Sequence, residues 1–193
     1  GYDIIGQAMS GLMSTTGWPD TPPTRTGTAI SDVVGGLSCC IGVLAAYCNR
    51  LKTGVGDKVD ISLVDGMVSS LEIINMIYLC TGRVPSPIGN RYEAIYPYDS
   101  FQAADGYVVL QIPELEDEKF DKNIKRVENH AALKPIIENW TKERKIDDIV
   151  ELLLAAGIPA GPINTIDRVV ADPHIAGARE MFVECDHPVA GKV

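Results

Sequence analysis

The sequence lacks the features that mark nucleic-acid-binding and membrane-spanning proteins. Its 17 Lys and Arg residues are outnumbered by 26 Asp and Glu residues, which gives a net charge of −9. Because a phosphate backbone requires a basic face, this charge argues against nucleic acid as the main partner, although a local basic pocket for a small anion is compatible with it. No apolar run reaches the ~18 residues of a membrane span, and no signal peptide is visible. We therefore expect a cytoplasmic protein that binds neither nucleic acid nor membrane.

The sequence also lacks metal-binding motifs and the motifs of serine and cysteine hydrolases. Five cysteines make an odd number without metal-ligand spacing, and the three histidines are widely separated. No Gly-x-Ser-x-Gly elbow occurs, and no cysteine lies beside a plausible base. The residues concerned are Cys39, Cys40, Cys48, Cys80, Cys185, His130, His174 and His187. We expect no metal site and interpret the cysteines as reduced core residues rather than disulfide or zinc ligands.

A long helix is predicted after a loop of turn-forming residues at 16–27, TGWPDTPPTRTG. Apolar residues beyond this loop are spaced three or four apart, which predicts one buried helical face. Ser31 or Asp32 is the expected N-cap, and Gly54 lies where the helix is expected to stop. The residues of the predicted buried face are Leu37, Ile41, Leu44, Cys48 and Leu51.

The next segments continue an α/β pattern. Residues 57–63, DKVDISL, alternate like a short strand, and residues 63–79 have helical spacing. Residues 81–91 are rich in Pro and Gly and predict a linker or exposed loop, so we expect a domain boundary near residues 80 to 95. At 193 residues the chain has room for one large domain or two small ones.

The second half predicts a hairpin followed by helices. Residues 96–112 read as a hairpin that turns at Asp105-Gly106. One helix is expected around 130–140, beginning near Pro135, and a second ends at Gly157. The second of these helices begins at 146. The remaining segments are an acidic surface stretch at 113–123, a rigid connector at 158–165 and a strand-like tail at 179–193.

Asp32 is the first candidate for chemistry. If Ser31 caps the helix, Asp32 occupies the first helical position, where the helix dipole and unpaired N–H groups favour an ionised carboxylate. A carboxylate held there beside Gly35 and Gly36 has the features of a nucleophile or a base. The alternative is that Asp32 is itself the cap and only stabilises the helix, by about 1 kcal/mol.

Other candidates carry weaker signals. The GxG at 54–56 has no following GK[ST] and precedes a strand pattern rather than a helix, so a turn is favoured over a phosphate loop. Gly89-Asn90-Arg91 is either a loop over a site or an ordinary turn. Arg25, Arg50 and Arg91 have the chemistry to bind a carboxylate or phosphate, but each is also typical of a solvated surface charge.

Several motifs, taken in order, resemble class III CoA-transferases, the family of the formyl-CoA and carnitine-type CoA-transferases and of the related α-methylacyl-CoA racemases. The resemblance rests on GYDIIGQAMSGLMSTTG, PPTRTG, ISDVVGG and RLKTGVGDKVDISLVDG in the first half. IGNRYEAIYPYDSFQAADGYVVL, GIPAGPINTIDRVVADPHI and VECDHPVAGKV extend it through the second half. It therefore covers nearly the whole chain.

The resemblance implies roles for individual residues. The family's nucleophilic aspartate corresponds to Asp32, and a family active-site tyrosine corresponds to Tyr2, with Asp3 as the neighbouring acid. Because the racemase branch has a histidine at that position, Tyr2 favours transferase over racemase. A glycine loop that shields the site corresponds to the region of Gly89 and Asn90, although this sequence has no run of glycines there.

The same resemblance implies a fold and a reaction. Residues 1–80 would be part of a Rossmann-like large domain that binds CoA and bears the nucleophile, 81–95 a linker, and 96–193 a smaller α+β domain, as in interlocked dimers. The implied reaction moves coenzyme A from an acyl-CoA to a carboxylic acid, with CoA as substrate and no permanently bound cofactor. Since family members are longer, the chain resembles an internal fragment or shortened member. An acyl-CoA racemase and a catalytically inactive assembly module are the alternatives.

Overall fold

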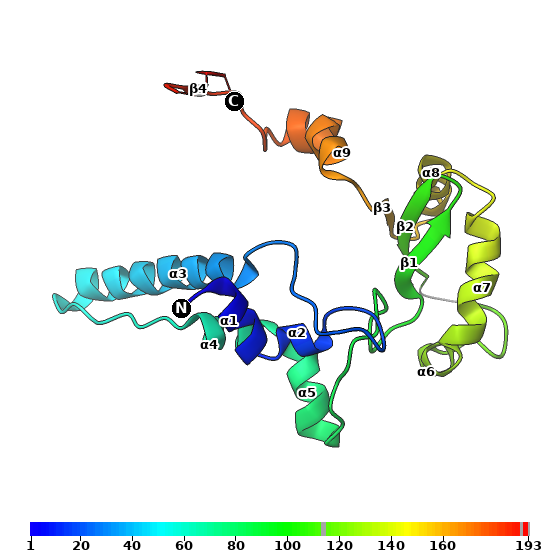
Figure 1. The fold of residues 1–193 in the computed structure, drawn as a ribbon, viewed down its shortest axis with the longest axis horizontal. Helices are drawn as coiled ribbons and strands as arrows, with labels where there is room; N and C mark the ends of the chain where they lie inside the picture. The colour runs from blue at the N-terminus through cyan, green and yellow to red at the C-terminus, as the bar shows by residue number, and fades with distance from the viewer. Residues whose placement is uncertain (113–114, 190, 193) are drawn as a thin grey trace. The chain divides into compact units, whose positions relative to one another are not determined.

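The computed structural model describes residues 1–112, 115–189 and 191–192. The chain divides into two compact units, Gly1–Asn90 and Arg91–Val193, and this division lies inside residues 81–95 (Figure 1). The first unit is helical, whereas the second contains a small antiparallel sheet with helices packed on it. The result is a mixed α/β fold.

The first unit contains five helices, namely α1 (Asp3–Met9), α2 (Leu12–Thr15), α3 (Ile30–Thr53), α4 (Leu63–Ser70) and α5 (Glu72–Thr81). The predicted loop at 16–27 is confirmed, since the chain between α2 and α3 has no regular structure. The predicted stop is confirmed as well: Gly54 has a left-handed φ of 76°, and its N–H donates to the Arg50 carbonyl at 2.8 Å. Helix α3 contacts α1 and α4.

The predicted buried face of α3 is wrong. Leu37 is 60% exposed and Ile41 is 68% exposed, and Leu44, Cys48 and Leu51 are exposed too. All five cysteines are free and exposed, so their interpretation as core residues is also wrong. The face that packs carries small residues instead: a Cβ on Gly35 would lie 2.5 Å from Leu63 Cδ2, and one on Gly42 would lie 2.7 Å from Val59 Cγ1. Close packing along this face requires small residues. The large apolar residues of α3 therefore lie on its other face, which is exposed.

Helix α3 also corrects the expectation that no segment is apolar enough to span a membrane. An 18-residue stretch of this 24-residue helix has a mean hydropathy of 1.7, and α4 with α5 are together long and apolar enough as a bent pair. Length and composition alone are weak evidence, because core helices of soluble proteins have the same properties. The Gly35 and Gly42 contacts with Leu63 and Val59 show that one side of α3 is a protein-packing surface.

The predicted strand at 57–63 is wrong, and the predicted helix over 63–79 is two helices. A strand forms only when its backbone groups pair with a neighbour, and no described residue supplies such a partner in this unit. The helix breaks at Leu71, where α4 and α5 meet at 72°. Ser69 and Ser70 both donate their hydroxyls to the Gly66 carbonyl at 2.8 Å, a bond that competes with helix continuation and bends helices.

The second unit is built on a three-stranded sheet in the order β1-β2-β3, from β1 (Tyr98–Ala103), β2 (Gly106–Gln111) and β3 (Ala160–Pro162). The predicted hairpin is confirmed with its turn one residue earlier, since Gly106 pairs with Ala103 inside the ladder. Helices α6 (Asn123–Glu128), α7 (His130–Thr141) and α8 (Ile146–Ala155) follow, then α9 (Ile166–Ala171) and a π-helix, η1 (Pro173–Ala178). A short second sheet pairs β4 (Asp186–His187) with β5 (Gly191–Lys192).

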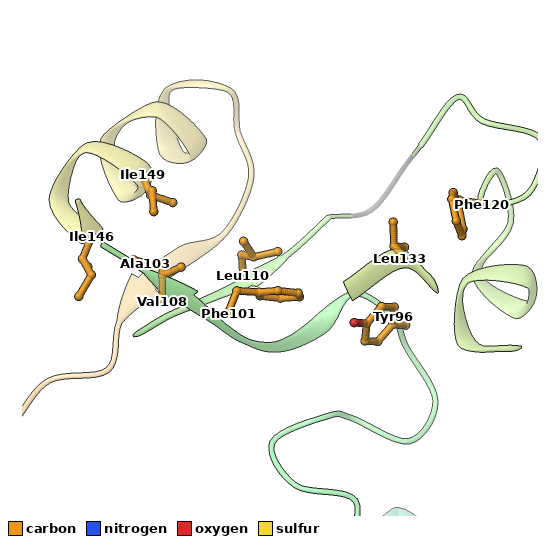
Figure 2. Packing of buried hydrophobic residues seen from close by; sticks show 9 residues of the cluster. All are labelled: Tyr96, Phe101, Ala103, Val108, Leu110, Phe120, Leu133, Ile146 and Ile149. Atoms are coloured by element: carbon orange, nitrogen blue, oxygen red, sulfur yellow. The ribbon is translucent and has the colours of Figure 1, made fainter. Parts of the chain in front are cut away.

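The core of this unit lies between the sheet and helices α7 and α8 (Figure 2). Phe101 and Val108 face each other across the hairpin and are fully buried, as is Ile149 of α8. Ile146 and Leu133 add further buried surface from α8 and α7. Among the described residues nine buried ones form this cluster, so the second unit has a hydrophobic core of its own.

Three sequence predictions in the second unit require correction. Helix α7 begins at His130, with Pro135 inside it rather than at its start. The predicted connector at 158–165 contains β3, which extends the sheet through pairs such as Leu110 with Ala160. In the predicted strand-like tail, only β4 and β5 are paired among the described residues. The acidic stretch 113–123 is largely exposed where it is described, apart from buried Phe120, and its residues 113–114 lie outside the described part.

Candidate active site

The start of helix α3 is capped by a residue from another helix. The N-cap position is Ala29, so neither Ser31 nor Asp32 is the cap, contrary to the sequence prediction. Asp3, the first residue of α1, accepts a hydrogen bond from the Ser31 N–H through Oδ1 at 3.0 Å. The Ser31 hydroxyl lies 2.9 Å from the same oxygen and 3.0 Å from the Asp3 carbonyl. A carboxylate from α1 thus satisfies one of the free N–H groups at the α3 N-terminus.

Gln7 completes this arrangement from one turn further along α1. Its Nε2 donates to Asp3 Oδ2 at 2.8 Å and to the Thr28 carbonyl at 3.3 Å. Its Oε1 accepts from the Thr26 N–H at 3.0 Å and lies 3.3 Å from the Thr26 hydroxyl. Gln7 and Ser31 are fully buried. The single Gln7 amide therefore ties α1 to the loop that leads into α3.

Close packing holds the same junction. A Cβ on Gly6 would lie 2.7 Å from Ser31 Oγ and 2.9 Å from Ser31 Cβ, so only glycine allows α1 to approach α3 this closely. Helix α4 contacts α1 as well, with Leu63 Cβ 3.4 Å from the same position. Three helices thus meet around Gly6.

The Asp3 carboxylate is stabilised in its ionised form. Partial burial raises the pKa of Asp3, but the hydrogen bonds from the Ser31 N–H, the Ser31 hydroxyl and the Gln7 amide outweigh it, and the Arg25 charge acts in the same direction. The pKa of Asp3 is therefore lowered from its ordinary value of 3.8. Arg25 is exposed and donates to the Thr26 carbonyl at 3.0 Å.

Asp32 occupies the third position of α3, directly after Ser31. It is exposed, and no hydrogen-bond donor to its carboxylate occurs within residues 1–112, 115–189 and 191–192. Because Asp3 and Ala29 hold the helix start, Asp32 is not required as a cap. Its carboxylate is therefore available to a substrate while its backbone is held in the first turn of a long helix.

Tyr2 lies next to Asp3, as Asp32 lies next to Ser31. The hydrogen bond between Asp3 and Ser31 thus joins the residue that follows Tyr2 to the residue that precedes Asp32. Tyr2 is 81% exposed and forms the N-cap position of α1. It lines a hollow of ≈ 260 Å³ with residues of α1 and α4, including Ile5 and Leu63.

Gly89 and Asn90 belong to a different part of the first unit. Gly89 has a left-handed φ of 72°, and its N–H donates to the Gly17 carbonyl at 2.9 Å. A Cβ at Gly89 would lie 2.5 Å from two atoms of the Trp18 indole, so glycine is required for the contact. This geometry places the Gly89 turn against the loop before α3. Gly89 thus contacts Gly17 and lies against Trp18 rather than Asp32.

Three residues of this region were missed by sequence reasoning about chemistry. Ser31 was considered only as a cap, and Trp18 gave no signal beyond its position in a loop. Gln7 was detectable, because its i, i+4 spacing from Asp3 predicts a side-chain contact on one helix face. Its bonds to Thr26 and Thr28 were not detectable, since the intervening loop has no pattern that sets its path.

A second hollow lies along α3 and α4 on the same unit. Its volume is ≈ 240 Å³, and polar and apolar atoms both line it. Ser38 of α3 and Asp65 and Ser69 of α4 contribute to it, together with Asp60 and Ser62 from the segment before α4.

Comparisons with known proteins identify the family of this chain. The family description "CoA-transferase family III" matches residues 1–193. A succinyl-CoA:mesaconate CoA-transferase of Haloarcula marismortui is 35% identical over 98% of this chain and 51% of its own length. An acetyl-CoA:oxalate CoA-transferase of Acetobacter aceti is 36% identical over 95% of this chain and 51% of its own length. The human succinyl-CoA:glutarate CoA-transferase is 32% identical over all of this chain and 48% of its own length.

Solved structures show the same relationship. A CAIB/BAIF family protein from Brucella suis matches with a TM-score of 0.78 and 32% identity, covering all of this chain and 58% of that protein. A Mycobacterium tuberculosis protein matches with a TM-score of 0.83 at 24% identity over 55% of its length, which shows the shared fold. The chain spans about half the length of the curated relatives it matches. The match over its whole length shows that the chain belongs to CoA-transferase family III.

Proposed function

We propose that the protein carrying this chain transfers coenzyme A from an acyl-CoA donor to a carboxylic acid acceptor, with Asp32 as the nucleophile. The observation that carries the proposal is an exposed carboxylate in the first turn of α3, held by neighbours that leave it unpaired. Family membership supports the reaction class, since its named relatives transfer CoA to mesaconate, oxalate or glutarate.

The first half of the proposed reaction proceeds through two covalent intermediates on Asp32. The carboxylate attacks the thioester carbonyl, the C–S bond breaks, and CoA thiolate leaves behind a mixed aspartyl anhydride. The thiolate then attacks the aspartyl carbonyl of the anhydride. This step forms an aspartyl-CoA thioester and releases the donor acid as its carboxylate.

The second half reverses these steps with the acceptor. The acceptor carboxylate attacks the aspartyl-CoA carbonyl and expels CoA thiolate, which then attacks the acceptor carbonyl of the new anhydride. Asp32 leaves as a free carboxylate, and the acceptor leaves as acyl-CoA. The complete reaction consumes no proton and no water. The site must nevertheless exclude water, because water would hydrolyse either intermediate.

Positioning must supply much of the rate, because a carboxylate is a modest nucleophile. Well-oriented reacting groups gain about 7–11 kcal/mol over freely diffusing ones. The α3 junction supports such positioning through buried Ser31 and Gln7. In this proposal Tyr2 holds the Asp32 carboxylate or donates to a developing oxyanion, and Gly89 and Asn90 belong to the substrate and CoA site. The family resemblance implies the same site for Asp3.

The decisive experiment is chemical trapping in the full-length protein. The enzyme is incubated with acyl-CoA and quenched with hydroxylamine, and the adduct is mapped by mass spectrometry. A hydroxamate on Asp32 is the expected result. A hydroxamate on another acid, or none, would remove Asp32 from the mechanism. Deuterium uptake at the α-carbon of the acyl-CoA without carboxylate exchange would identify a racemase instead.

The proposal includes a homodimer in the cytoplasm, with CoA as substrate and no permanently bound cofactor. The exposed large apolar face of α3 supports association, because soluble monomers rarely leave such faces open. Sedimentation equilibrium of the full-length protein tests this, and a monomer at micromolar concentration would contradict it.

The same exposed face favours a second candidate for the isolated chain, a catalytically inactive assembly module. Calorimetric titration of residues 1–193 with CoA separates the two candidates. Micromolar binding indicates that a usable site survives in the chain, and no binding favours the module.

A further inference from the structure

We infer that Asp3, together with Gln7 and Ser31, is the positioning device for Asp32 rather than a group that touches the substrate. This inference rests on the proposed function, because it assigns roles around the nucleophile proposed there. It departs from the expectation that Asp3 belongs to the substrate and CoA site.

The first argument is that both oxygens of the Asp3 carboxylate are occupied by protein donors. Oδ1 accepts from Ser31, and Oδ2 accepts from the Gln7 amide at 2.8 Å. Charge-assisted hydrogen bonds of this kind are about twice as strong as neutral ones. Three protein donors thus fill three of the about four lone-pair sites of the carboxylate, which leaves little capacity for a substrate group.

The second argument is that the network is buried and sterically tight. Ser31 and Gln7 have no exposed surface, and the Gly6 contact with Ser31 leaves no room for adjustment. A helix cap that serves only helix stability does not require a buried side-chain amide, such as that of Gln7, bonded to the capping carboxylate. This cap is held from α1 and from the loop at Thr26 and Thr28, so the start of α3 is fixed from two directions.

The third argument is adjacency to the reacting group. Ser31 and Asp32 are consecutive residues in the first turn of α3, so a shift of the Ser31 backbone moves the Asp32 carboxylate with it. A 1 Å misplacement of a reacting group costs about 10²-fold in rate. The network is therefore expected to act on the rate through the position of Asp32.

The test compares variants of the full-length protein. Asp3→Asn keeps an oxygen for the Ser31 N–H but turns an NH₂ toward the Gln7 amide, so two donors oppose each other. We expect kcat to fall about tenfold for Asp3→Asn and about a hundredfold for Asp3→Ala. KM for acyl-CoA is expected to change less than twofold. The double variant Asp3→Asn/Gln7→Glu restores the donor–acceptor pair between positions 3 and 7 but loses the bond to the Thr28 carbonyl, so it is expected to recover about threefold in kcat and not the full rate.

The matched control is Asp172→Asn in the second unit. Asp172 is also a capping carboxylate, and its Oδ1 accepts from the N–H groups of His174 and Ile175 at 2.8 and 2.9 Å. Its replacement is expected to lower the melting temperature without a change in kcat per active site. Active sites are counted by hydroxylamine trapping, so that loss of folded enzyme is not mistaken for a slower step.

The outcomes separate the inference from the proposed function. If the wild-type enzyme gives no adduct on Asp32, the proposed function fails and the inference fails with it. If Asp32 is trapped but Asp3→Asn retains full kcat, or raises KM with kcat unchanged, the positioning role alone is overturned. A loss of kcat that the double variant does not recover would assign the effect to the Asp3 charge instead of the network.

Discussion

The two units of this chain differ in what holds them together. Nine buried hydrophobic residues form the core of the second unit, whereas Met67 and Leu71 are the buried hydrophobic residues found among the described residues of the first. The first unit relies instead on glycine contacts and on the buried network of Asp3, Gln7 and Ser31. The candidate chemistry thus lies in the unit that buries less apolar surface.

This difference has an energetic consequence. Burial of apolar surface is the dominant favourable term in folding, so the second unit carries most of the stability that this chain supplies by itself. The first unit leaves Leu37, Ile41 and Leu51 of α3 exposed, and gains stability when that face is covered. We therefore expect substitutions in the first unit to change kcat more than the free energy of unfolding. Substitutions in the second unit are expected to change the free energy of unfolding more than kcat.

The largest expected effect is on activity and comes from Asp32→Asn. Removal of the nucleophile is expected to lower kcat of the full-length enzyme by about a thousandfold or more, with little change in unfolding free energy. Steady-state CoA transfer and urea unfolding measure the two quantities. Asp148→Asn is the matched control, because Asp148 is also an exposed third residue of a helix, α8. Equal losses in both variants would contradict the assignment of chemistry to the first unit.

The next effect is on stability and contrasts two apolar truncations. Phe101→Ala removes a fully buried ring and is expected to cost about 3–5 kcal/mol. Leu37→Ala truncates an exposed residue of α3 and is expected to stay within about 0.5 kcal/mol in the isolated chain.

Tryptophan fluorescence can report on each unit separately in this experiment. Trp18 lies in the first unit, and Trp140 packs against the core of the second. Urea unfolding is followed in Trp18→Phe and Trp140→Phe backgrounds. A large loss from Leu37→Ala would show that the face of α3 is already covered in the isolated chain.

A smaller effect is expected from glycine substitutions in the first unit. Gly6→Ala forces a methyl group against Ser31 and is expected to cost about 1–3 kcal/mol and to lower kcat. Gly36→Ala meets no atom within 4 Å and lies inside α3, so a gain of about 0.5–1 kcal/mol is expected. Equilibrium unfolding of the two variants side by side tests whether the α1–α3 contact is as tight as the structure indicates.

A further small effect concerns the buried hydroxyl of Tyr96 in the second unit. The Tyr96 hydroxyl is buried without a hydrogen-bond partner among the described residues, and burial raises the pKa of Tyr96. Tyr96→Phe removes an unsatisfied polar group and is expected to stabilise the second unit by about 1 kcal/mol. A destabilisation of the same size would mean that the hydroxyl has a partner in solution.

The sequence determined the local elements whose signals lie within a few residues. Gly54 and Gly157 mark helix ends because glycine adopts the left-handed conformation at little cost, and both have positive φ values. The Asp105-Gly106 turn signal, followed by a run of strand-forming residues, indicated the hairpin. The ordered motifs also identified the family, and with it Asp32 as a candidate.

Tertiary structure alone decided the features that depend on distant partners. Apolar spacing in α3 marks a face suited to burial but does not determine which side packs here, and the contacts of Gly35 and Gly42 set that choice. The strand pattern at 57–63 remained unpaired because pairing needs a neighbour that local sequence cannot supply. The cap of α3 came from Asp3, 28 residues away in sequence, rather than from Ser31 or Asp32. Because this long-range bond caps α3, the Asp32 carboxylate is not needed as a cap. The bond forms only when α1 packs on α3.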